Sequence, residues 1–490
     1  MKIFRDSLLF SSARYVIMVL SAVRNLVLAR VLDPEHFGYW VVLSLVLAYG
    51  DLVHGGLRHA GDREIPYFRG QERHDEVVHV ERILFGGILF FSSIALLVLS
   101  LLGILGIPTM GWPQSALIIA GLVIVAEQVS RFSYMILRTR HEFVLSSKLE
   151  IGFEVTRTAL VCTLAAFQGV LGALIGFLLA AVLNVGYFGM VLRLPPRPLA
   201  NILKLRMLLN TGFLLFSVAL VQLLILNLDR VIGSFILTPS DLGIYGLAAL
   251  AMQVPLMFSQ SLSTVFVPSA SEAFGRRNSL EDVAQLFFRL LRASAVLGPV
   301  FTGLVLIVSK VIIHWFLPAY ELSVSVIVVL LPGAMLSVLI PPTSALLVIA
   351  RKGKFLLVLE AAALLGGCMV FWASLRFASG LQALSFGMVA AILWYSSLSM
   401  MGAFYPFRFS GNRLLKEVIF NYGPAVYAMV LLFGVIPGIL GEGEGPQRSV
   451  LELGIFFLSY APLLLIGFRA VRTMTLPGNT SEGDVAKKSV

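Results

Sequence analysis

Residues 29–40 read ARVLDPEHFGYW, and residues 234–245 read SFILTPSDLGIY. A shift of 205 residues without gaps pairs identical or similar side chains: Leu32 with Leu237, Pro34 with Pro239, Gly38 with Gly243 and Trp40 with Tyr245. In both copies an apolar stretch ends at a proline and a second one begins after a glycine. The pattern indicates that the chain contains two copies of one structural unit.

The composition around these copies is that of an integral membrane protein. Apolar residues make up 58% of the 490 residues and charged residues only 13%, about half of the ~25% found in ordinary soluble domains. The net charge of +10 comes from Lys and Arg spread through short connectors, with no basic domain. That distribution is typical of the positive-inside pattern, so we expect no nucleic-acid partner.

Apolar runs of ~20 residues are the unit that crosses a bilayer, and we expect about 14 of them in an all-α integral membrane protein. The expected transmembrane helices cover residues 7–32, 37–57, 83–105, 112–137, 149–167, 169–192, 208–237, 242–270, 284–312, 322–350, 355–375, 381–404, 417–440 and 448–469. Six helices separate the two copies of the repeat, and this even number makes the copies parallel. Parallel repeats related by an axis along the membrane normal are a transporter architecture.

The expected organisation is two parallel-repeat six-helix lobes around a central cavity, followed by two further helices. The N-terminal lobe is assigned to residues 1–206 and the C-terminal lobe to 207–404. The additional helices are assigned to 405–472 and a disordered cytoplasmic tail to 473–490. Basic connectors alternate with acidic or neutral ones along the whole chain, so both termini are expected to be cytoplasmic.

Two arginines lie in the first expected helix, and they are the first candidates for a binding site. An ionisable group inside the bilayer costs at least ~2.5 kcal/mol and usually faces a cavity or a partner. Arg24 lies near the midplane, about 12 Å from the end of the helix at Leu32; Arg14 lies closer to the start. The same shift of 205 pairs Arg24 with Asp229, which precedes Arg230.

Two interpretations of this pairing stay open. In the first, Arg24 and Arg230 line a water-filled cleft between the lobes and bind an anion. In the second, Arg24 and Asp229 form a salt bridge between the lobes without any role in substrate binding.

Further ionisable residues occur in pairs at helical spacing. Glu127 and Arg131 are four residues apart, and Glu154 and Arg157 three apart, so each pair lies on one helix face and can neutralise itself. Arg157 stays a further candidate for the cavity.

Asp51 and His54 lie near the inner end of the second expected helix. A proton relay, a gate and an interfacial contact all fit this pair, and with Asp229 they are the candidates for coupling or gating. Lys310 and Glu360 are isolated in the sequence, and Lys310 is expected to extend toward the membrane surface.

The chain lacks the motifs of enzymes and metal sites. No phosphate-binding P-loop, HExxH, GxSxG or metal-spaced Cys/His cluster is present. We therefore expect a protein that is not an enzyme and has no metal and no cofactor. Transport must then draw on an ion gradient, the membrane potential or consumption of the product.

Three segments carry a family resemblance. They are LDRVIGSFILTPSDLGIYGLAALAMQVPLMFSQSLSTVFVPSASEAFGRRN (228–278), ARVLDPEHFGYWVVLSLVLAYGDLVHGGL (29–57) and LPAYELSVSVIVVLLPG (317–333). The chain resembles polysaccharide and O-antigen flippases (Wzx-type oligosaccharide flippases) of the multidrug/oligosaccharidyl-lipid/polysaccharide exporter superfamily. The resemblance implies that the protein moves an undecaprenyl-type, polyprenyl-diphosphate-linked oligosaccharide from the cytoplasmic to the outer leaflet of a bacterial inner membrane.

The resemblance also implies which residues bind substrate. Arg24 matches the first-helix arginine that attracts the pyrophosphate in such flippases, with Arg230 and Arg157 as further positions. A guanidinium suits this task because it matches phosphate oxygens bidentately. The implied partners are the lipid-linked oligosaccharide, the lipid bilayer, and a polysaccharide polymerase with its assembly proteins.

Other functions are weighed against this one. A cation-coupled drug or metabolite antiporter of the same superfamily is expected to place acids rather than arginines in the first helix. A peptidoglycan-precursor flippase is closer in mechanism. A membrane glycosyltransferase, polymerase or ligase is expected to carry a large outer loop, which the spacing of the helices does not leave room for. A non-transporting scaffold leaves the duplicated lobes unexplained.

Overall fold

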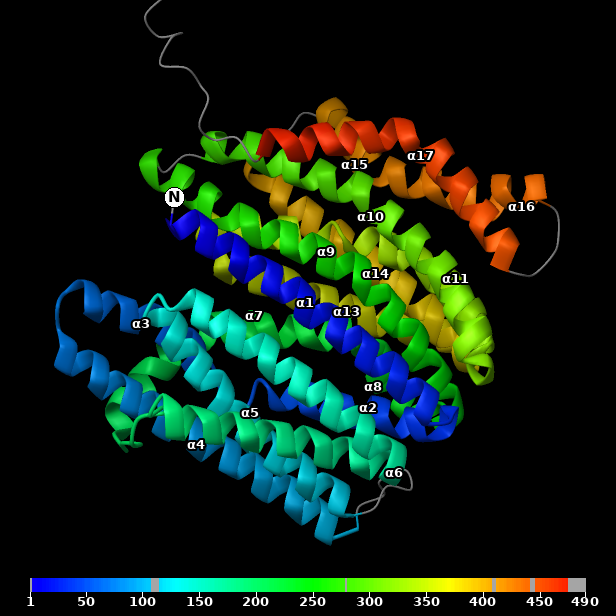
Figure 1. Cartoon of the computed structure of the whole chain (residues 1–490). Helices are drawn as coiled ribbons and strands as arrows, with labels where there is room; N and C mark the ends of the chain where they lie inside the picture. The colour runs from blue at the N-terminus through cyan, green and yellow to red at the C-terminus, as the bar shows by residue number, and fades with distance from the viewer. Residues whose placement is uncertain (1, 107–113, 278–279, 408–410, 441–445, 475–490) are drawn as a thin grey trace, which may run out of the picture. The chain divides into compact units, whose positions relative to one another are not determined.

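The computed structural model describes residues 2–106, 114–277, 280–407, 411–440 and 446–474 (Figure 1). Throughout these ranges the regular secondary structure is helical, which confirms the all-α prediction. The expected tail, 473–490, lies outside the described residues from position 475 onward.

Most helices follow the predicted ranges, with two main exceptions. The expected span 37–57 ends as a helix at Gly50 and is followed by a helix that was not predicted, Leu57–Gly70; the expected span 208–237 is divided at Asn227. The bounds of the helices are α1 Lys2–Val31, α2 Pro34–Gly50, α3 Leu57–Gly70, α4 His74–Ile104, α5 Ser115–Thr139, α6 Phe143–Val191, α7 Ile202–Leu226, α8 Leu228–Ile236, α9 Pro239–Arg277, α10 Leu280–Phe316, α11 Leu322–Ser337, α12 Ile340–Ile349, α13 Gly353–Phe377, α14 Gly380–Phe404, α15 Gly411–Val430, α16 Ile436–Leu440 and α17 Pro446–Met474. Short 3-10 turns cover Pro318–Tyr320 and Tyr405–Phe407, and a π-helical turn covers Leu431–Val435.

Ten stretches of the described chain are long and apolar enough to cross a membrane, and Leu451–Ile466 is a shorter apolar helix. Helices α1 and α2 are not among the ten. Helix α2 has only 17 residues, and residues 13–31 of α1 alone carry three arginines, Arg14, Arg24 and Arg30. The chain is thus a multi-pass membrane protein, while the count of 14 helices stays a prediction.

Helix α6 contains two of the predicted spans, joined by a sharp bend. Gln168 and Gly169 have non-helical backbone angles, and Gly169 has φ 58° and ψ −138°, a conformation that favours glycine. Beyond the bend the two halves run back against each other: a Cβ at Gly176 would lie 2.7 Å from the Cα of Val161. The predicted division between residues 149–167 and 169–192 is confirmed, and α6 is a helical hairpin.

The packing of α4 shows how this part of the chain suits a bilayer. One face of α4 is buried, as at Val80 and Ile88. Another face exposes large apolar side chains, such as Phe90, Leu97 and Leu101. Lipid tails can cover such a face because they are as apolar as the side chains themselves. In Figure 1, α4, α5 and α6 lie side by side, and α1 packs along α6.

The chain divides into two compact units. The first comprises Met1–Leu250, Phe316–Val326 and Glu360–Gly387, and the second comprises Ala251–Trp315, Ile327–Leu359 and Met388–Val490. The lobe boundaries expected from the sequence, at residues 206 and 404, stay a prediction.

In the first unit the two copies of the repeat touch each other reciprocally. A Cβ at Gly38 in α2 would overlap the carbonyl oxygen of Pro239, and a Cβ at Gly243 in α9 would overlap that of Pro34. Equivalent residues of the two copies thus make equivalent contacts, as a two-fold relation between them requires. Only glycine allows the two backbones to approach this closely.

In the second unit the last helix is fixed to α10, which corrects one prediction. Lys310 was expected to be isolated, yet its Nζ lies 2.9 Å from the Glu452 carboxylate of α17. The Tyr460 hydroxyl donates to the carbonyl of Val296 at 3.0 Å.

In the first unit Glu360 is not isolated either, because Gln222 Nε2 donates to it at 2.6 Å. Sequence spacing could not show these partners because each lies more than a hundred residues away.

Candidate functional site

A pocket of about 450 Å³ lies in the first unit among α1, α3, α5, α6 and the turn that follows α2. Its charged and histidine lining residues are Arg14, Asp51, His54, Arg58, His59, Asp62, Glu127, Arg131, Arg138, Glu150, Glu154 and Arg157, with Tyr134 and Phe153 among the others. Its size is within the range of small-molecule sites, 300–1,000 Å³. Most of these charges are connected by ion pairs.

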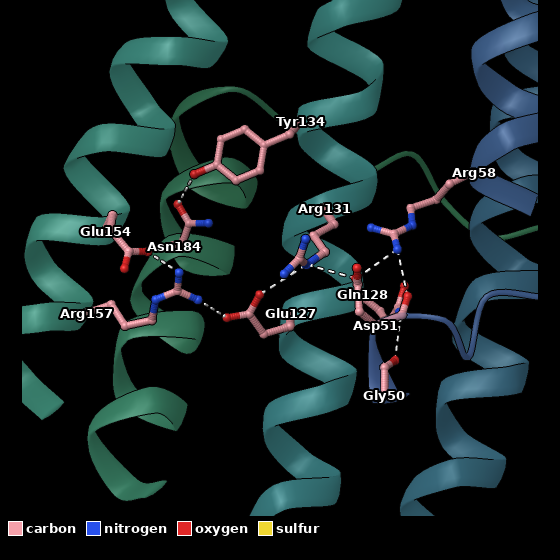
Figure 2. A network of polar contacts seen from close by, with 10 residues as sticks. All are labelled: Gly50, Asp51, Arg58, Glu127, Gln128, Arg131, Tyr134, Glu154, Arg157 and Asn184. Carbon is pink, nitrogen blue, oxygen red and sulfur yellow. Dashed lines mark hydrogen bonds and ion pairs between the residues drawn. The ribbon is translucent and has the colours of Figure 1, made fainter. Parts of the chain in front are cut away.

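The ion pairs begin at Asp51, where α2 ends (Figure 2). The Asp51 carboxylate lies 2.7 Å from Arg58 Nη2 and 3.0 Å from Arg131 Nε. Gln128 Nε2 donates to the backbone carbonyls of Gly50 and Asp51, at 2.9 Å each. These contacts fix the end of α2 against α5.

The ion pairs continue from α5 to α6 and α1. Arg131 lies 3.4 Å from Glu127, and Glu127 lies 2.8 Å from Arg157 of α6. Arg157 and Arg24 each bind one oxygen of Glu154, so this carboxylate joins two arginines from different helices. The result is a continuous series of alternating charges from Arg58 to Arg24, which we call the arginine–carboxylate network.

Accessibility differs along the network and is highest at Arg131. The Glu154 side chain is 1% exposed, Glu127 is 15% exposed and Asp51 is 31% exposed. Arg131 is the most accessible arginine, with 44% of its side chain exposed. A ligand that enters the pocket therefore meets Arg131 and its two carboxylates before it meets Glu154.

The turn between α2 and α3 brings Arg58 back to Asp51. Gly55 and Gly56 have φ of 57° and 96°, which glycine adopts without a steric cost. Gly56 also packs against Gly212 of α7, where a Cβ would lie 3.0 Å from the Gly212 carbonyl. A side chain at Gly56 would be strained by its positive φ and would press on the Gly212 carbonyl.

Four of the candidates from the sequence line this pocket: Arg14, Asp51, His54 and Arg157. His54 is almost fully buried; its Nδ1 accepts a hydrogen bond from the Gly56 backbone N–H at 3.0 Å. Arg24 is also buried and belongs to the network through Glu154. The alternative salt bridge from Arg24 to Asp229 is not the pairing that the structure shows.

Asp229 and Arg230 lie at the start of α8, apart from the lining of this pocket. The buried Asp229 carboxylate accepts hydrogen bonds from the Tyr245 hydroxyl at 2.8 Å and from the Arg230 backbone N–H at 2.7 Å. Arg230 Nη2 donates to the Leu226 carbonyl at 3.0 Å. The two residues that the repeat pairs with Arg24 thus form a separate polar cluster.

The structure adds residues that the sequence did not single out. The spacing of Glu127 with Arg131 and of Glu154 with Arg157 predicted both pairs within their helices, and both are present. What spacing missed is the contact between helices, from Glu127 to Arg157 and from Glu154 to Arg24. Arg58 was treated only as a basic connector residue; the Gly55–Gly56 pair was the available signal that the chain turns back there.

The charges in the pocket nearly balance. Five arginines and five carboxylates line it, and Arg24 is added behind Glu154. An arriving anion therefore competes with the carboxylates for the arginines. In the described part of the chain no group of three or more His, Cys, Asp or Glu residues is arranged to hold a metal ion.

Comparisons with known proteins agree with this fold. A lipid II flippase, MurJ, in an inward closed conformation superposes with a TM-score of 0.71 at 16% identity, covering 95% of this chain and 99% of that one. An inward-facing multidrug resistance MATE transporter of the MOP superfamily gives a TM-score of 0.59 at 14% identity, covering 82% and 95%. At these identities the likeness concerns the fold. No curated protein matches the chain.

The sequence itself matches one protein family over more than half of its length. The match covers residues 27–325, which include most of the arginine–carboxylate network, and the family is described as polysaccharide biosynthesis protein. The chain therefore belongs to this polysaccharide biosynthesis protein family.

Proposed function

We propose that this protein is a flippase that moves a polyprenyl-diphosphate-linked oligosaccharide across a bacterial inner membrane by alternating access. The arginine–carboxylate network carries the proposal, because it holds several guanidinium groups beside a pocket inside a membrane protein. Guanidinium groups match phosphate oxygens bidentately. In a low-dielectric pocket that attraction is stronger than in water.

The carboxylates hold the arginines of the network in defined positions. Without substrate, Glu127 and Glu154 keep Arg157 in place and compensate its charge. A diphosphate that enters beside Arg131 competes with Asp51 and Glu127 before Glu154, because both are more accessible than Glu154. Binding is then an exchange of one anion for another, which keeps charges inside the membrane paired.

Orientation follows from the distribution of basic connectors. The positive-inside pattern predicts that both termini are cytoplasmic and that the turn after α2 lies on the cytoplasmic side. The sugar and diphosphate then occupy the hydrated pocket while the undecaprenyl-type tail stays in the bilayer. On this proposal the protein is a transporter and not an enzyme, and a polysaccharide polymerase with its assembly proteins uses the product.

Export of cations is the second candidate, because five carboxylates line the pocket. Four of them, however, already lie within 4 Å of an arginine: Asp51, Glu127, Glu150 and Glu154. The network has four arginines and three carboxylates, and this one excess positive charge favours an anionic substrate. A peptidoglycan precursor with the same diphosphate would use the same arginines, and only the saccharide distinguishes it.

The test is the leaflet in which the glycolipid accumulates. Cells depleted of the protein are complemented with the wild type, with Arg24→Ala, or with Arg63→Ala, an exposed arginine of α3. Accessibility to a membrane-impermeant glycosidase then locates polyprenyl-linked glycans. We expect inaccessible glycolipid after depletion and with Arg24→Ala, but not with Arg63→Ala. Unchanged surface glycan after depletion would contradict the proposal.

A further inference from the structure

One aromatic ring in the first unit is shared by two arginines of the network. The guanidinium carbon of Arg24 lies 5.1 Å from the centroid of the Phe177 ring, and that of Arg157 lies 5.3 Å from the same centroid. Both distances are within the ~6 Å at which a cation is attracted to the face of an aromatic ring. The ring is buried, so little water competes with these contacts.

The hairpin of α6 places this ring. The bend at Gly169 turns the second half of α6 back along the first, and Gly176 allows the halves to touch at Val161. Phe177 follows Gly176 directly, and Arg157 lies one helical turn from Val161. Trp40 of α2 packs against the Phe177 ring, and the two ring centroids lie 5.4 Å apart.

The pair of arginines needs such support because its charges repel each other. Arg24 and Arg157 both bind the Glu154 carboxylate, and Arg157 also binds Glu127. The network as a whole has four arginines and three carboxylates, so one positive charge is in excess. The quadrupole of an aromatic ring attracts cations without adding a counter-charge. The ring therefore holds the two guanidinium groups together and leaves the excess positive charge of the network for a ligand, which a fourth carboxylate would cancel.

We propose that Phe177 is a positioning residue of the anion site: its ring orients Arg24 and Arg157 so that both can bind one diphosphate. This inference rests on the proposed function, since it names how that site is built. Phe153 differs in its role, because among the described residues the one guanidinium over its ring is that of Arg157, at 4.8 Å. Removing the Phe153 ring leaves Arg24 in place, whereas removing the Phe177 ring affects both arginines.

The test measures binding of inorganic pyrophosphate to the purified full-length protein in lipid nanodiscs. Phe177→Leu and Phe177→Met retain most of the apolar volume without the ring, and Phe177→Tyr retains the ring. Phe188→Leu is the matched control: Phe188 lies about 16 Å farther along the same half-helix, and its ring packs on Tyr134 at 5.0 Å. Thermal stability is recorded for every variant.

We expect Phe177→Leu and Phe177→Met to weaken pyrophosphate binding about five- to thirtyfold. Phe177→Tyr is expected to bind within about twofold of the wild type, and Phe188→Leu to lower thermal stability without this loss of affinity. The use of two non-aromatic replacements keeps the test valid if one of them fails to fold.

Two results would overturn the inference and leave the proposed function intact. One is unchanged affinity in the non-aromatic variants, and the other is an equal loss in Phe177→Tyr, which would indicate a role in packing alone. A wild-type protein that does not bind pyrophosphate would contradict the proposed function itself, and the inference with it.

Discussion

The two ends of helix α2 are held in different ways. At the first end, Gly38 touches α9 backbone against backbone, in a contact that Gly243 mirrors. At the last end, the Asp51 carboxylate lies between Arg58 and Arg131. The first contact depends on shape and excludes any side chain. The second depends on charge, so an added anion can compete with it.

This difference indicates which end responds to a ligand. A contact between glycine backbones has no group that an anion can displace. The charged end can exchange partners without leaving a charge unpaired, because each carboxylate there joins two arginines. We therefore expect substrate to act on the end of α2 that carries Asp51. We expect the glycine contact to be disturbed by substitutions that add volume, and not by substrate.

The largest effect is expected from breaking the most buried part of the network. Glu154→Ala leaves Arg24 and Arg157 without the carboxylate that they share. Removing one partner of a buried ion pair costs about 3–5 kcal/mol. Equilibrium unfolding in mixed micelles measures this loss, with Glu142→Ala as control because Glu142 is exposed at the start of the same helix. Equal stability of the two variants would show that the network does not stabilise the fold.

A smaller effect is expected at the other end of α2. Gly38→Ala places a methyl group on the Pro239 carbonyl, so α2 and α9 must separate. Overpacking of this kind costs about 1–3 kcal/mol. Gly186→Ala in α6 is the control, since no atom lies within 4 Å of its added Cβ, and there alanine should stabilise the helix by about 0.5–1 kcal/mol. The same unfolding assay compares the two variants. If the Gly38→Ala protein were as stable as the Gly186→Ala protein, the claim that this contact excludes any side chain would be wrong.

The smallest effect is expected at Asp33, which precedes α2. Its carboxylate accepts a hydrogen bond from the His36 backbone N–H at 2.8 Å and so caps the helix. Partial burial acts to raise the pKa of Asp33, but the hydrogen bonds from the His36 backbone and ring outweigh it, and the pKa lies below its usual range. Replacing such a cap with alanine costs about 1 kcal/mol.

The pH dependence of that effect has a definite sign. A carboxyl group whose pKa is lower in the folded state stabilises the fold above its unfolded-state pKa, ~3.9. This contribution is lost as the pH falls through the lower, folded-state pKa. Unfolding of wild type and Asp33→Ala is therefore compared at pH 7 and at pH 3. A stability difference that grows toward pH 3 would refute the role of the ionised cap.

The fold was largely predictable because apolar runs and their interruptions are local properties. The division of α6 at Gln168 and Gly169 was readable for this reason, as were the ion pairs at helical spacing. Partners on other helices were not, because one sequence does not show which helix face meets which neighbour. Glu154 joins Arg24 across 130 residues, and Lys310 meets Glu452 across 142.

The candidate site was predicted in part for a similar reason. Arg24 and Arg157 were singled out because a charge inside an apolar run is conspicuous. Phe177 was not, because a phenylalanine inside an apolar run has no visible signal. Only the hairpin at Gly169 shows that its ring faces two arginines.

Reconstitution tests the central claim, that the arginines of the network bind the diphosphate of a lipid-linked oligosaccharide during flipping. Proteoliposomes carrying a fluorescent polyprenyl-diphosphate oligosaccharide are exposed to a membrane-impermeant quencher, with wild type, Arg157→Gln or Arg63→Gln. Loss of one charge-assisted hydrogen bond of about 1.5–3 kcal/mol corresponds to roughly ten- to hundredfold. We predict that the wild type and Arg63→Gln equilibrate the label between the two leaflets and that Arg157→Gln does so at least tenfold more slowly. Wild-type vesicles that match protein-free ones, or Arg157→Gln vesicles that match the wild type, would contradict the claim.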